Sequence, residues 1–164
     1  YYREANNYLQ NKEYRLAYLH FYMIIEYCFA NGKFEQKAQV SEYMQSIDLC
    51  FAVLNSLASI KKEIPLQYNW LQSEIQNKYK TFSLKNVLRY ICQQRGVLAH
   101  GSLQSAKYVF NEDDLHTITI FISQICFIIC GNMQVYSMSS LDFKKKRLSE
   151  RSEMLKNELK ISIE

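Results

Sequence analysis

The sequence predicts an all-α fold, an up-and-down bundle of five to six helices, on three observations. The chain has 164 residues, 48% of them apolar, which suits a single domain with one sizeable core. It contains four glycines and one proline, whereas the turns of β-rich proteins use these residues in quantity. Apolar residues also recur at the three- and four-residue spacing of amphipathic helices. No repeat or linker interrupts the pattern, so we treat residues 1–164 as one domain.

Helices are predicted along the whole first half of the chain. The long early helix should end at Asn31 and Gly32, which can adopt the left-handed conformation that closes a helix. The next one should stop before Pro65, since proline cannot continue a helix. The predicted helices cover residues 12–30, 35–62 and 66–79, and residues 3–9 can add a short one.

Three further helices are predicted in the second half. Thr81 or Ser83 can cap the first, because a hydroxyl accepts hydrogen bonds from the free N–H groups of the first turn. Asn111 can cap the second, and the three acidic residues after it favour the positive end of the helix dipole. The last is highly charged and can project from the bundle as part of a C-terminal segment, 141–164. These helices cover residues 84–99, 111–138 and 141–160.

Charge, cysteines and apolar runs narrow the functional classes. The net charge of +4 permits an anionic partner without requiring one. The five cysteines are odd in number and form no CxxC pair, so we expect reduced thiols and a cytoplasmic protein.

The apolar segment 115–130 is expected to be a core helix that is too short for a bilayer, and its β-branched run 118–123 is the one argument for a strand. We expect no membrane association, no metal and no cofactor, since zinc spacings and phosphate-binding glycine loops are missing. The first residue is Tyr1, which leaves room for an upstream segment.

The segment QQRGVLAHGS, residues 93–102, carries the clearest chemical signal. Arg95 falls on the apolar stripe of its helix, four residues after Ile91, and a half-buried guanidinium needs an anion or several acceptors. His100 follows at the helix end, where Gly96 and Gly101 leave the backbone room to reorient. An arginine that holds a phosphate and a histidine that titrates near neutrality suit phosphodiester cleavage.

The spacing of this pair is weak by itself. Arg15 and His20 have the same spacing in the middle of a helix, with no helix end or glycine nearby, and we interpret them as structural. For Arg95 and His100 the alternative is an arginine neutralised by a core acid such as Glu26 and a histidine that caps its helix.

The segment LRYICQQRGVLAHGS resembles the Arg-x4-6-His signature of HEPN domains, small helical domains named for nucleotide binding in higher eukaryotes and prokaryotes. NKEYRLAYLHFYMIIEYCFANGKF is similar to the first long helix of that family, and the apolar helix after Asn111 fits its later core helix. The resemblance implies a metal-independent endoribonuclease of toxin or antiviral type. Arg95 and His100 would be its catalytic pair, in a composite site of a homodimer. An antitoxin or another protein partner is also implied, although Gly96 stands where many members have asparagine. The alternatives are a non-catalytic HEPN-like module that binds nucleotide, RNA or a protein, and a plain helical interaction domain.

Several other polar residues are candidates for contact with RNA. Gln94, Ser102 and Lys107 flank the motif and can bind a phosphate or base, although glutamines near a helix end are often simply exposed. Glu26 can support the motif as an acid or stay solvated or salt-bridged on its helix. The basic run 144–147 can bind RNA phosphates or form a solvated helix face.

Overall fold

The computed structural model describes residues 1–100, 111–138, 149–150 and 153, and all regular structure in this part of the chain is helical. The all-α class is therefore confirmed. The predicted C-terminal helix over 141–160 lies almost entirely outside the described residues.

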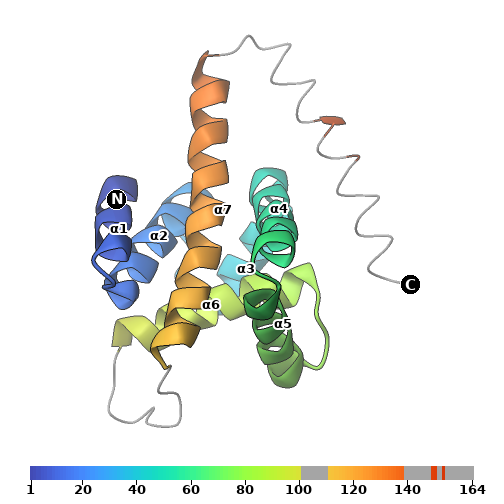
Figure 1. Cartoon of the computed structure of the whole chain (residues 1–164). Coiled ribbons are helices and arrows are strands. Elements are labelled where there is room, and N and C mark those ends of the chain that lie inside the picture. Colours follow the sequence, from blue (N-terminus) through green and yellow to red (C-terminus); the bar gives the residue numbers. More distant parts are fainter. Residues whose placement is uncertain (101–110, 139–148, 151–152, 154–164) are drawn as a thin grey trace.

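The described part of the chain forms seven helices, whose arrangement can be followed in Figure 1. They are α1 (Tyr2–Gln10), α2 (Tyr14–Phe29), α3 (Gln36–Gln45), α4 (Ile47–Glu63), α5 (Pro65–Tyr79), α6 (Leu84–His100) and α7 (Glu112–Met138).

The prediction of one continuous helix over residues 35–62 is wrong, because Ser46 separates α3 from α4. The backbone of Ser46 is extended, with φ −85° and ψ 105°, and its hydroxyl accepts a hydrogen bond from the N–H of Leu49 at 3.2 Å. A serine side chain that bonds the backbone nearby offers the chain an alternative to a continuous helix. Asp48 in the first turn of α4 reinforces the new start electrostatically.

The other predicted helix ends lie close to those observed. Asn111 Oδ1 accepts from the N–H of Asp114 at 2.7 Å, and Ser83 Oγ accepts from the N–H of Asn86 at 3.4 Å. After α2, Asn31 and Gly32 have φ of 49° and 71°, the left-handed conformation that ends a helix. Local side-chain chemistry thus marks the starts of α4, α6 and α7, and a left-handed backbone marks the end of α2.

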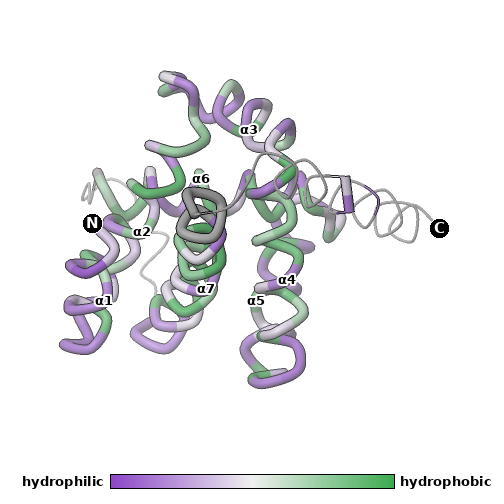
Figure 2. The backbone as a smooth tube through the Cα atoms, turned by 90° about the horizontal axis from the view of Figure 1, so that it is seen from above, coloured by the Kyte–Doolittle hydropathy of each residue, from purple (hydrophilic) through white to green (hydrophobic). Residues whose placement is uncertain are grey.

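Helix α7 lies at the centre of the bundle, with α1 and α2 on one side and α4 and α5 on the other (Figures 1 and 2). Two contacts set its register against α2. Thr119 Oγ1 donates to the carbonyl of Leu115 at 2.6 Å and also lies 3.3 Å from the carbonyl of Tyr14, and Cys126 Sγ donates to the carbonyl of Phe21 at 3.2 Å. The partners are seven residues apart on both helices, so α2 and α7 run parallel, side by side. The run 118–123 is helical and supplies buried core residues such as Phe121, so it does not form a strand.

One helix of the described chain, over Glu112–Asn132, is long and apolar enough to cross a membrane by length and composition alone. The apolar segment 115–130, which was expected to be a core helix, is the middle part of this stretch. The central helix of a protein core can have the same length and apolar composition, so these two properties alone do not indicate a membrane span. Ile118, Ile122 and Ile125 of this stretch are buried in the bundle.

Candidate functional site

The predicted motif arginine lies where α6 crosses α2. The hydroxyl of Tyr18 donates to the carbonyl of Ile91 at 2.8 Å and holds the two helices together in the core. One turn further along α6, Arg95 Nη2 lies 3.8 Å from Glu26 Oε1, and the Arg95 side chain keeps 38% of its surface exposed. Its guanidinium carbon is also 5.9 Å from the ring centre of Tyr22. Arg95 is therefore half-buried, as predicted, and is paired with the acid that the sequence suggested.

Glu26 is held by a second and stronger partner. Gln39 Nε2 on α3 donates to Glu26 Oε1 at 2.8 Å and to the carbonyl of Lys33 at 3.0 Å. The hydroxyl of Tyr22 donates to Gln39 Oε1 at 2.9 Å and accepts from the hydroxyl of Tyr43 at 3.3 Å. Gln39 is only 4% exposed, so this network lies inside the protein. The position of the Glu26 carboxylate thus does not depend on Arg95.

Burial determines the protonation of the groups behind the site. It raises the pKa of the Tyr22 and Tyr43 hydroxyls well above their ordinary value, so both remain proton donors. It also raises the pKa of the nearby Cys92 thiol to about 11, which leaves this thiol neutral and unreactive at physiological pH. All five cysteines are free.

The second motif residue is only partly described. His100 is the last residue of α6, but its imidazole lies outside the described part of the structure. Convergence of Arg95 and His100 on one cleft therefore stays a prediction. Ser102, Lys107 and the basic run 144–147 also lie outside the described residues.

Gln94 corrects a sequence-based prediction. Its side chain is 2% exposed, so it lies in the core and does not face solvent, where an RNA would bind. Position 94 is three residues after Ile91 and four before Leu98, both buried, and thus lies on the inner face of α6. The neighbouring Arg95 lies at the edge of this face instead of at its centre.

Arg15 and His20, the other Arg-x4-His pair, both lie on α2, but their side chains contact two different neighbouring helices. Arg15 Nε donates to the carbonyl of Leu98 in α6 at 2.8 Å, whereas His20 Nδ1 lies 3.5 Å from Glu4 Oε2 in α1. The two side chains bind different helices and share no site. Arg15 nevertheless contacts the last turn of the motif helix, which the sequence did not reveal because the partners are 83 residues apart.

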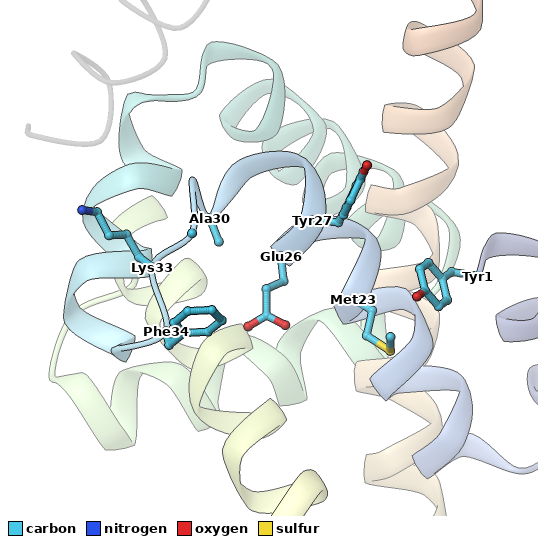
Figure 3. Close-up of a pocket in the computed structure, with 8 residues that line it drawn as sticks. Tyr1, Met23, Glu26, Tyr27, Ala30, Lys33 and Phe34 are labelled. Carbon is cyan, nitrogen blue, oxygen red and sulfur yellow. The ribbon is translucent and has the colours of Figure 1, made fainter.

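A surface pocket of about 320 Å³ opens beside Glu26 (Figure 3). The ring of Phe34 lies on one side of the Glu26 carboxylate and the side chain of Met23 on the other. Lys33 and Tyr27 line the rim and point outward. Phe34 is 85% exposed, which is unusual for a phenylalanine, and no periodic pattern pointed to it because it follows the helix end in a short connection.

Within the described residues, no group of three or more His, Cys, Asp or Glu side chains is arranged to hold a metal ion. The chain matches no model of a known protein family, no curated protein and no solved structure.

Proposed function

We propose that the chain is a metal-independent endoribonuclease of toxin or antiviral-defence type, with Arg95 and His100 in a composite site of a homodimer. The observation that supports this most is the exposure of Arg95. Its side chain is 38% exposed, and its carboxylate partner in the described part of the chain lies at 3.8 Å, beyond hydrogen-bond distance. An arginine held in this way keeps donors free for a phosphate.

The proposed reaction uses the ribose itself as nucleophile. A neutral His100 removes the proton of the 2′-OH, and the 2′-oxygen attacks the adjacent phosphorus. Arg95 stabilises the negative charge that develops on the phosphoryl oxygens. The bond from phosphorus to the 5′-oxygen then breaks, and a protonated histidine supplies the proton to the leaving oxygen. The products are a 2′,3′-cyclic phosphate and a 5′-OH.

The dimer follows from the need for two proton transfers. One copy of the motif supplies a single histidine, whereas two copies supply a base and an acid. The purified protein should therefore be a dimer with its two-fold axis near α6. A stable monomer by light scattering at micromolar concentration, unchanged by added RNA, would count against the composite site. As a toxin, the dimer is expected to act on cytoplasmic RNA and to be neutralised by an antitoxin or another protein partner.

The test is cleavage of RNA without divalent metal. EDTA should not inhibit the reaction, and DNA or 2′-O-methyl RNA should resist, because neither carries the 2′-OH nucleophile. Arg95→Ala and His100→Ala should each lower the rate on the order of 10² to 10⁴-fold.

His20→Ala is the matched control, because His20 has the same spacing from an arginine but pairs with Glu4 of α1. It should leave the rate nearly unchanged. Equal loss in the three variants, or no cleavage by the wild type under any metal condition, would refute the proposal.

The second candidate is a non-catalytic HEPN-like module that binds nucleotide, RNA or a protein partner. The Arg95–Glu26 pair favours it, since a phosphate must compete with this carboxylate for the guanidinium. Gly96 also lacks the polar side chain that many family members have at this position. Binding of RNA without any cleavage would support this candidate. Absence of RNA and nucleotide binding would leave a plain helical interaction domain.

A further inference from the structure

The pocket beside Glu26 combines a planar apolar wall with a free carboxylate oxygen. Glu26 Oε1 accepts one hydrogen bond, from Gln39, and keeps a second lone pair for a ligand, whereas Oε2 has no hydrogen-bond partner among the described residues. The Glu26 side chain is 23% exposed and lines the pocket. Phe34 and Met23 lie on either side of the carboxylate (Figure 3). A flat ring that enters between them would meet the carboxylate with its edge.

The Glu26 carboxylate and the connection that carries Phe34 are held in place by one buried amide. Gln39 Nε2 bonds both Glu26 Oε1 and the carbonyl of Lys33, the residue before Phe34. The hydroxyl of Tyr22 fixes the other end of this amide. Because the carboxylate and the connection that carries Phe34 share this anchor, the pocket is preorganised for a ligand.

From this geometry we infer that the pocket binds a guanine base, which stacks on Phe34 and donates its N1–H and N2–H groups to the Glu26 carboxylate. The inference rests on the proposal that the chain binds RNA or nucleotide. A base is a planar aromatic ligand, and stacking on an exposed phenylalanine is a common way to hold an unpaired base. The volume of about 320 Å³ is ample for one base.

The carboxylate selects guanine over the other bases. An ionised carboxylate only accepts hydrogen bonds, so it pairs best with an edge that presents two adjacent donors. Guanine presents N1–H and N2–H side by side. The Watson–Crick edges of adenine, cytosine and uracil each place an acceptor next to any donor, and an acceptor placed against the carboxylate is repelled.

The surrounding charge makes the pocket compatible with an anionic ligand. The Glu26 carboxylate lies 3.8 Å from the Arg95 guanidinium, and Lys33 lies on the rim of the pocket. Arg95 therefore offsets part of the charge of the Glu26 carboxylate, and Lys33, whose side chain points outward, adds positive charge at the rim.

The test is direct binding of nucleoside 5′-monophosphates, which carry no internucleotide phosphate to cleave. By calorimetry or NMR titration of the wild-type chain, GMP should bind on the order of 10- to 100-fold more tightly than AMP, CMP or UMP, the usual size of bidentate discrimination. IMP, which has N1–H but no N2 amino group, should fall about 10-fold below GMP. These comparisons need no variant, so no loss of folding can obscure them.

Variants then test the separate roles of the Glu26 carboxylate and the Phe34 ring. Glu26→Gln should remove the preference for GMP, because an amide presents one acceptor in place of two. Phe34→Ala should weaken the four standard nucleotides alike, since stacking is tolerant of the base. Phe127→Ala is the matched control, because Phe127 is a 67% exposed phenylalanine on α7 that does not line the pocket.

Equal affinity for the four standard nucleotides, equal affinity for GMP and IMP, or equal loss in Phe34→Ala and Phe127→Ala would overturn the inference. It would also fail if GMP did not bind and Phe34→Ala instead weakened a dimer, because a second copy would then cover the pocket. RNA cleavage without any preference for guanine would overturn only the base site. GMP binding without RNA cleavage would retain the base site and refute the ribonuclease.

Discussion

Truncation of Arg95 and of Glu26 should have unequal effects on stability, although the two residues form one ion pair. Arg95→Ala removes a half-exposed pair at 3.8 Å and a distant contact with the ring of Tyr22. Such pairs contribute roughly 0.2–1 kcal/mol and such ring contacts about 0.5 kcal/mol, so the free energy of unfolding should fall by about 1 kcal/mol. Glu26→Ala removes the same pair and also the charged acceptor of Gln39, which is worth about 1.5–3 kcal/mol. Its total loss should be about 2–3 kcal/mol, because Gln39 keeps a second acceptor in the carbonyl of Lys33.

Urea unfolding of both single variants and the double variant, followed by circular dichroism at 222 nm, measures these losses and the coupling between the two residues. The coupling should be below about 1 kcal/mol, as for partly exposed pairs. A loss of about 3 kcal/mol in Arg95→Ala, matched by Glu26→Ala and strongly coupled to it, would refute the reasoning. Arg95 would then be a structural partner of Glu26, and the case for a phosphate-binding arginine would weaken accordingly.

Three further predictions concern the bundle. Phe121→Ala should lower the free energy of unfolding by about 3–5 kcal/mol because Phe121 is 1% exposed, whereas Phe127→Ala on the exposed face of α7 should change it by less than about 0.5 kcal/mol, as urea unfolding can show. The pKa of Cys92 is raised from its ordinary value of 9.0 to about 11, so the folded state binds more protons than the unfolded chain above pH 9. The Cys92 contribution to stability should be constant below pH 9 and fall by about 2–3 kcal/mol by pH 11, and Cys92→Ala should show a shallower decline over this range in unfolding experiments. Arg15→Ala should remove the hydrogen bond to the carbonyl of Leu98, and faster amide hydrogen exchange confined to the last turn of α6 would confirm it.

Helix ends were the most predictable part of the fold. Pro65 occupies the first position of α5, Asn111 caps α7, and Asn31 with Gly32 closes α2, each through a local backbone or side-chain preference. Ser46 was the exception, although its hydroxyl acts through the same local chemistry. The apolar spacing continues across Ser46, so the periodicity concealed the break.

The motif helix shows where periodicity stops being informative. Positions 94 and 95 are about 100° apart around a helix, and both lie near one stripe of apolar residues. The sequence favoured Arg95 as the inward residue, whereas the packing of α6 against the bundle buries Gln94 and leaves Arg95 at the edge. Which neighbour is buried depends on the helices that cover α6, and no local pattern records their position.

The sequence by itself determined the helical class, most helix ends and the half-buried position of Arg95, because these depend on residue spacing and on contacts within one turn. Only the tertiary structure decided which groups surround Arg95. Glu26 comes from α2 and Gln39 from α3, while Phe34 lies between these two helices. The place where these residues meet depends on how α2, α3 and α6 pack. This packing results from the burial of apolar faces on helices that are far apart in the sequence. The carboxylate pocket is therefore a property of the packed bundle that no single segment of the chain contains.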